Sequence, residues 1–191
     1  MLIANVATAQ VTDTLSGFLG LPFGSTKEQV REFISKNGAT ISSEKPNSIY
    51  AINLKQVLTP CTVTIVMFKF TSDNKMVSGS MLIEPSSAPL VFDAYDGIIS
   101  KLSLKYGPGS ESVDAKYPYS EDDKRRLSAI MAGYVAVETN WNLNDPNPSN
   151  TDKNTITVRI TNNPKIFIRI ENTKLYKQFA KEEQEAEKNS Y

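Results

Sequence analysis

The chain has 191 residues, of which 40% are hydrophobic and 22% charged, a composition typical of one globular domain. Its 21 lysines and arginines balance its 21 aspartates and glutamates. We therefore expect no nucleic-acid partner, because such proteins carry a basic excess. Histidine is absent, which excludes histidine-containing triads and the commonest zinc ligand. No long apolar run occurs, so we expect no transmembrane segment.

The amino terminus resembles the end of a secretory signal. Residues 1–6 are apolar, and Ala7-Thr8-Ala9 has the small-x-small form that signal peptidase cleaves before a residue such as Gln10. A basic start and a longer apolar stretch are missing, so a chance match is the alternative. We interpret residues 1–9 as a clipped signal peptide and expect a periplasmic or secreted protein, with residues 10–191 as a single α+β domain.

The first half predicts one helix followed by three strands. Ser25 and Glu28 have the spacing of a capping box, and Asn37-Gly38 is a typical helix end. Strands are expected at 48–54, 61–70 and 76–84, with a turn at 72–75 joining the last two. Apolar side chains occupy both faces of the strand at 61–70, which predicts a central strand covered on both sides.

The second half repeats this order. A helix is expected at 89–106, ended by Gly107-Pro108, then a loop at 109–119 and a short helix at 120–131. The next strand, 134–141, places on one face Val135, Val137, Thr139 and Trp141. A hairpin then presents one buried face made of Ile156, Val158, Ile160, Ile166, Ile168 and Ile170. A last helix begins at 172 or 173.

This order predicts an α+β fold with an antiparallel sheet of about six strands and the helices on one face. The two halves are interpreted as diverged copies of one helix-plus-meander unit. They could share one sheet or form two. No flexible linker separates them, which favours one domain.

A resemblance follows from three landmarks. The segment from Phe18 to Val30, which contains Gly20-Leu21-Pro22-Phe23-Gly24, resembles the opening of many uncharacterised secreted bacterial domains. Lys105-Tyr106-Gly107-Pro108 is similar to their second landmark, and the strand ending at Trp141 with its isoleucine-rich hairpin to the third. Their architecture is similar to that of β-lactamase-inhibitor-protein-like domains, in which helix-capped antiparallel sheets bind other macromolecules. The resemblance implies a fold and export, and no contact residue is transferred.

Residues with catalytic or ligating potential are few. Cys61 lies within a predicted strand, which favours a buried, inert thiol. The oxygen-rich loop from Asp145 to Asp152 lacks the central glycine and terminal glutamate of an EF-hand. We therefore expect no metal, no cofactor and no catalytic residue. Since any two acids can meet in a fold, a carboxylate-based hydrolase acting on envelope glycan or peptide is kept as an alternative.

Aromatic side chains give the candidate binding residues Tyr117, Tyr119 and Trp141. A proline stiffens the loop between the two tyrosines, and such rings are favoured at interfaces. The alternative is that the tyrosines pack over the sheet edge and Trp141 caps the core. Phe167 points away from the isoleucine face, so it lies under a helix or marks an exposed patch. The leading hypothesis is a non-catalytic binding module of the bacterial cell envelope with a protein or peptide partner; a cytosolic structural protein is the third.

Overall fold

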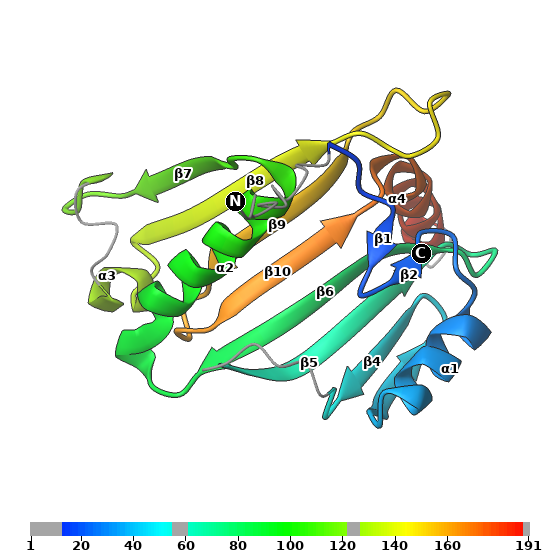
Figure 1. Cartoon of the computed structure of the whole chain (residues 1–191), viewed down its shortest axis with the longest axis horizontal. Helices are drawn as coiled ribbons and strands as arrows, with labels where there is room; N and C mark the ends of the chain where they lie inside the picture. Colours follow the sequence, from blue (N-terminus) through cyan, green and yellow to red (C-terminus); the bar gives the residue numbers. More distant parts are fainter. Residues whose placement is uncertain (1–12, 55–60, 122–126, 189–191) are drawn as a thin grey trace, which may run out of the picture.

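A computed structural model describes residues 13–54, 61–121 and 127–188. Its helices are α1 (Lys27–Lys36), α2 (Val91–Tyr106), α3 (Leu127–Met131) and α4 (Thr173–Lys188), with a 3-10 turn (Ala88–Leu90) before α2 (Figure 1). Its strands are β1 (Gly17–Phe18), β2 (Leu21–Pro22), β3 (Thr40–Lys45), β4 (Ser48–Ile52), β5 (Cys61–Phe70), β6 (Met76–Pro85), β7 (Ser110–Ala115), β8 (Val135–Leu143), β9 (Asn154–Ile160) and β10 (Ile166–Glu171). The predicted signal peptide at 1–9 lies outside the described residues.

One antiparallel sheet joins the two halves of the chain. Its strand order is β3-β4-β5-β6-β10-β9-β8-β7, so each half supplies a four-stranded meander and the two meet at β6 and β10. The α+β class is confirmed, but the expected strand number is wrong, because the sheet has 8 strands and β1 and β2 form a small sheet of their own. The missed strands are β3 and β7, whose polar, exposed sequences at the sheet edges lack an apolar alternation.

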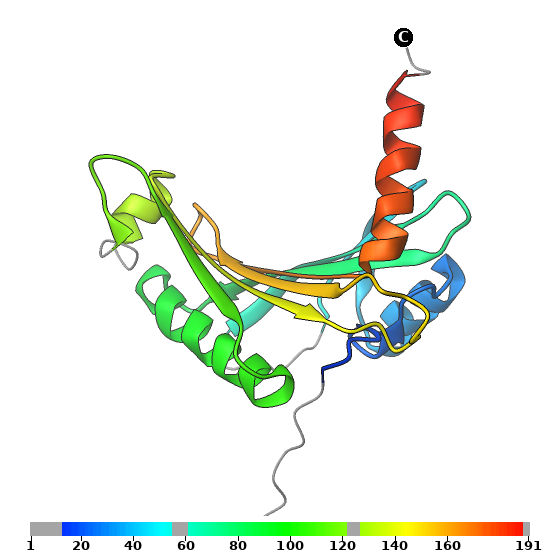
Figure 2. The ribbon, with the colours of Figure 1, turned by 90° about the horizontal axis from the view of Figure 1, so that it is seen from above.

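The helices lie on both faces of the sheet. Helices α1 and α2 cover one face, whereas α4 stands on the opposite side (Figure 2). The expectation that every helix covers one face is therefore wrong for α4. The sheet is bowed, and its concave side is the side of α4 (Figure 2). No helix in the described residues is long and apolar enough to cross a bilayer.

The core lies between the sheet and helices α1 and α2. The Phe18 ring packs edge-on against Phe68 at 5.6 Å between centroids, and both side chains are fully buried. Gly79 lies directly beneath Phe18, because a Cβ added at Gly79 would come within 1.9 Å of the Phe18 ring. A glycine is therefore required where the segment before α1 crosses the centre of the sheet.

Helix α1 begins one residue later than expected. Thr26 is the N-cap: its Oγ1 accepts from the Gln29 backbone N–H at 3.3 Å, and Gln29 Oε1 accepts from the Thr26 N–H at 2.8 Å. Ser25, the expected cap, instead donates its hydroxyl to the Pro22 carbonyl at 2.7 Å. The capping box is thus present, shifted by one residue, and it closes with an amide in place of a carboxylate.

The isoleucine hairpin has the expected register. Its residues Ile156, Val158, Ile160, Ile166 and Ile168 are buried against the helices, and Ile170 is half-buried. Of the short helix expected at 120–131, the structure describes α3, and residues 122–126 lie outside the described part. This hairpin fixes which side chains of β9 and β10 point the other way, toward the concave side.

Candidate functional site

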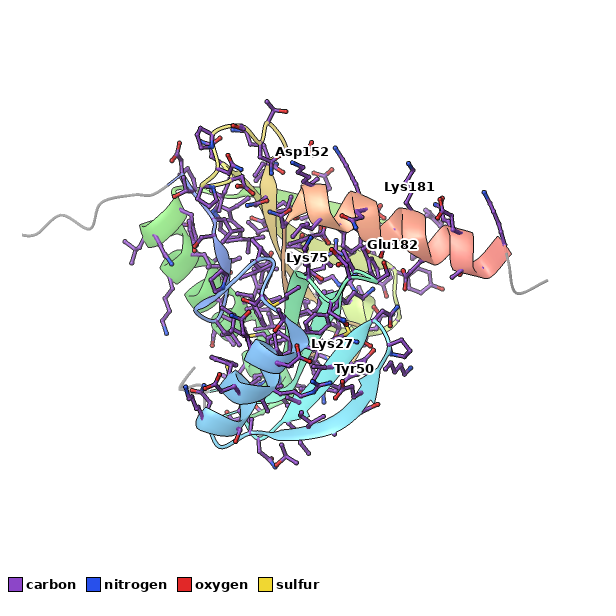
Figure 3. All side chains as sticks on the ribbon, turned by 90° about the vertical axis from the view of Figure 1, so that its right-hand side faces the viewer. Lys27, Tyr50, Lys75, Asp152, Lys181 and Glu182 are labelled. Carbon is purple, nitrogen blue, oxygen red and sulfur yellow. The ribbon has the colours of Figure 1, made fainter. Side chains whose placement is uncertain are left out.

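The sheet face turned away from α1 and α2, here called the open face, carries bulky apolar side chains. They come from four adjacent strands and are Tyr50, Ile65, Met67, Leu82 and Phe167, here called the apolar cluster. Tyr50 and α4 lie on the same side of the sheet, with α1 on the other (Figure 3). On this side of the sheet Figure 2 shows α4 rising from one end of the strands, while α1 and α2 lie on the other side.

The strand register brings the members of the apolar cluster together. Met67 lies opposite Tyr50 on β4, while Leu82 lies between Ile65 of β5 and Phe167 of β10. Directly opposed side chains on one face of a sheet are close enough to pack. The cluster lines a shallow cavity of about 160 Å³ that also includes Ser80 and Met81. All its members are half-buried, so they offer apolar surface to water.

Two arginines mark the border of the apolar cluster. Arg159 of β9 lies opposite Phe167, and its guanidinium lies 4.8 Å from the centroid of that ring. Arg169 of β10 lies opposite Ser80 and is two residues along the strand from Phe167. Arg159 and Arg169 are thus diagonal neighbours on one face, roughly 7 to 8 Å apart. A cationic border therefore separates the apolar cluster from the rest of the open face.

Beyond that border the open face is polar. Asn140 of β8 accepts a hydrogen bond from Thr157 Oγ1 at 2.8 Å and donates its amide to Glu138 at 2.7 Å. Glu138 lies opposite Arg159, yet the described contacts join its carboxylate to Asn140 and form no ion pair with Arg159. On β8 and β9 the open face therefore carries side chains that hydrogen-bond to one another, whereas on β4, β5, β6 and β10 it carries the apolar cluster.

Helix α4 bounds one end of the open face. The Lys69 ammonium of β5 lies 5.0 Å from the Phe179 ring centroid and 6.0 Å from that of Tyr176. Glu171, the last residue of β10, is buried, and burial raises its pKa above the ordinary value although Arg169 and Lys69 act to lower it. Its Oε2 lies 3.7 Å from Arg169 Nε. Neither atom has a hydrogen-bond partner in the described part of the chain.

The binding residues expected from the sequence lie elsewhere. Tyr117 is 93% exposed, and Tyr119 is half-buried with its ring 5.6 Å from that of Tyr134. Trp141 is 3% exposed and donates its indole N–H to the Gly107 carbonyl at 2.8 Å. Trp141 therefore packs in the core on the helix side, Tyr119 packs against the border of the core, and Tyr117 lies at the surface.

The sequence did contain a signal for the apolar cluster. The two-sided apolar pattern of β5 predicted a strand covered on both faces, and this expectation is wrong, since Ile65 and Met67 face the uncovered side. A bulge between Val63 and Ile65 moves Val63 to the core face. Of the two alternatives for Phe167, the exposed patch is confirmed. The apolar residues of β5 in excess of those the core needs therefore indicate an apolar surface.

The cavity beside α4 contains two acidic side chains that serve as hydrogen-bond acceptors. In the part of the chain that the structure describes, the cavity beside α4, of about 510 Å³, contains Glu182 and Glu183. These carboxylates accept from the Ser72 backbone N–H at 2.7 Å and from the Asn47 amide at 2.9 Å. Both carboxylates are therefore engaged in hydrogen bonds to protein groups. No cluster of potential metal ligands occurs among the described residues.

The surroundings of Cys61 and Asp145 favour a role in the structure of the protein for both side chains. Cys61 is half-buried, and burial raises the pKa of its thiol, which disfavours the thiolate needed for reactivity. Asp145 accepts from the Asn147 backbone N–H and from three amide side chains, those of Asn150, Asn154 and Asn172. The oxygen-rich loop thus uses its carboxylate to bind protein amides.

Comparison of the chain with protein-family models, with curated proteins and with solved structures finds no significant match.

Proposed function

We propose that this protein is a non-catalytic binding module that recognises a protein or peptide partner through the open face of its sheet. The observation that carries the proposal is the apolar cluster, which lies on the concave, uncovered side of the sheet. Contiguous exposed apolar patches with a polar rim are typical of interaction sites. Aromatic and methionine side chains are enriched at such interfaces, and Tyr50, Phe167 and Met67 are of these types.

The scaffold supports this role because it is rigid where the cluster lies. The side chains project from the central strands β4, β5, β6 and β10, which are hydrogen-bonded on both sides. A partner can bind without first ordering these side chains, which lowers the entropic cost of association. The resemblance to β-lactamase-inhibitor-protein-like domains, whose helix-capped sheets bind macromolecules, supports the same proposal.

The proposal is tested by capture and by matched variants. Met67→Ser removes an apolar side chain from the cluster, while Leu104→Ser removes one from α2, where Leu104 is 69% exposed. We expect wild type and Leu104→Ser to retain the same protein from an envelope extract, and Met67→Ser to lose it. With the purified partner, Met67→Ser should weaken binding by about 2 kcal/mol or more. Equal affinity of both variants would reject the open face as the binding site.

Location in the periplasm or outside the cell belongs to the same proposal. Mass spectrometry of protein expressed from the full upstream reading frame measures the mature amino terminus. We expect cleavage after Ala9, which gives a chain that begins with Gln10. An uncleaved chain in the cytosol would contradict export without affecting the open face.

A further inference from the structure

We propose that the partner of the open face presents a carboxylate next to a bulky apolar side chain, with the apolar group in the cluster and the carboxylate between Arg159 and Arg169. This inference is based on the proposed function and specifies the chemistry of the partner.

Apolar surface and a cation adjoin each other at Phe167. Phe167 belongs to the apolar cluster and at the same time lies beneath the Arg159 guanidinium, 4.8 Å from it. Leu82, Phe167 and Arg159 lie side by side on β6, β10 and β9. A side chain that fills the cavity beside Leu82 and Phe167 is therefore one strand away from Arg159. Such stacking leaves the edge N–H groups of the guanidinium directed outward, where they can donate to a carboxylate.

Neither guanidinium has an acid bonded to it by a hydrogen bond within the described ranges. Arg159 is exposed and forms no ion pair there, and the nearest cross-strand acid, Glu138, is bonded to Asn140. Arg169 pairs with Glu171 Oε2 at 3.7 Å, too far for a hydrogen bond, and its side chain is 42% exposed. Exposed N–H groups of both arginines can therefore donate to an incoming carboxylate.

The two arginines lie on neighbouring strands. Arg159 and Arg169 are diagonal neighbours on one face of β9 and β10, a separation that long side chains can span. A carboxylate between them can therefore accept from both guanidinium groups.

The probe is a library of random cyclic peptides displayed on phage. The library is selected on the wild-type protein and depleted on the double variant Met67→Ser/Phe167→Ser, so that retained clones require the apolar cluster. We expect the retained sequences to share an aspartate or glutamate close to an aromatic or large aliphatic residue. Thermal unfolding of each protein variant verifies that it is folded.

Synthetic peptides from this selection then identify the arginines. Arg159→Gln and Arg169→Gln should each weaken binding at least about tenfold, since truncating one member of a desolvated charge pair affects affinity strongly. Lys101→Gln on α2 is the charge-matched control and should have no effect. Replacing the peptide carboxylate by an amide should cause a similar loss, and combining it with Arg159→Gln should cause little more.

The outcomes separate the inference from the proposed function. If retained peptides lack an enriched carboxylate and bind both arginine variants as tightly as wild type, the inference is overturned while the open face stands as a binding site. If no peptide distinguishes wild type from the Met67→Ser/Phe167→Ser variant, both the inference and the proposed function are overturned.

Discussion

The Asp145 carboxylate accepts a hydrogen bond at 2.8 Å from the side-chain amide of Asn172, the residue whose own Oδ1 caps α4 by accepting from the Leu175 N–H at 2.9 Å. The same Oδ2 accepts from Asn154 at 3.2 Å, and Asn154 donates to the Leu15 carbonyl at 2.7 Å. A single carboxylate thus joins the loop before β9, the start of α4 and the segment before β1.

Replacement of this carboxylate should destabilise the protein. Asp145→Ala leaves several amide donors without an acceptor, so we expect a loss of about 2 kcal/mol in the free energy of unfolding. Asp152→Ala is the control, because its ion pair with Lys177 is at the surface and should contribute less than about 1 kcal/mol. Urea unfolding measures both. Equal stabilities of the two variants would contradict the role of Asp145.

The pH dependence of stability should reflect two acids whose pKa values are shifted in opposite directions, Asp145 and Glu171. Burial acts to raise the pKa of Asp145, but the hydrogen bonds from Asn147, Asn150, Asn154 and Asn172 outweigh burial and lower it below the ordinary 3.8. Its contribution is therefore present above that value and is lost as the pH falls through the folded pKa. Wild type should lose stability there relative to Asp145→Asn.

Glu171 should behave in the opposite way. Burial raises its pKa above the ordinary 4.5, so the folded state binds a proton more tightly than the unfolded state, and stability falls as the pH rises through this range. Glu171→Gln should therefore be more stable than wild type at neutral pH and equal to it well below pH 4.5. Unfolding titrations across this range measure the difference, and a constant difference at all pH values would contradict the buried carboxyl.

The contact between Phe18 and Gly79 gives a sharp packing prediction. Gly79→Ala would place a methyl group 1.9 Å from the Phe18 ring, and such overpacking should cost about 2 kcal/mol or more. In a Phe18→Ala background the same change should cost far less, since the obstructing ring is gone. A double-mutant cycle by thermal unfolding measures this coupling. Additive effects of the two substitutions would show that the ring lies elsewhere.

Two adjacent residues of β10 test which face of the sheet is covered. Ile168 is 6% exposed, and Ile168→Asp would bury an unpaired carboxylate, so we expect no folded protein. Phe167→Asp places the same group on the open face and should change stability by about 1 kcal/mol or less. Circular dichroism and cooperative thermal unfolding distinguish the two. A folded Ile168→Asp variant would show that the register is wrong.

The two tyrosines of the loop should differ in their contribution to stability. Tyr117→Ala should change stability within about ±0.5 kcal/mol, because that side chain is 93% exposed. Tyr119→Ala should cost about 1 kcal/mol, since its ring packs against Tyr134. If the loop contributes to recognition, Tyr117→Ala will weaken partner binding without affecting stability. Unchanged affinity would confine recognition to the open face.

The sequence predicted the buried strands and helices well because their side chains follow the period of the element. Ile156, Val158 and Ile160 alternate in the sequence and are buried in the structure, and β5 has the expected limits. The edge strands β3 and β7 could not be predicted, since their side chains are exposed and polar and their pairing depends on partners distant in sequence.

The apolar cluster could not be predicted from the sequence for a different reason. Phe167 and Met67 carry the same apolar character as core residues, and nothing local to either residue tells which face of a sheet a helix will cover. Only the packing of α1 and α2 on one face makes the other face visible as a surface. Tyr117 and Tyr119 lie outside any periodic pattern, so a sequence marks them as binding candidates more readily than aromatic residues of a strand such as Phe167.

The pairing of β6 with β10 joins the two halves of the sheet, so the chain could be divided into fragments that associate there. Cutting the chain between β6 and α2 would give two fragments, one with α1 and the other with α2, α3 and α4, each with a four-stranded meander that joins the other through this pairing. Leu82 and Phe167 face each other across it, so neither fragment carries the complete apolar cluster. Because the partner would bind only the assembled fragments, its binding should shift the equilibrium toward their association.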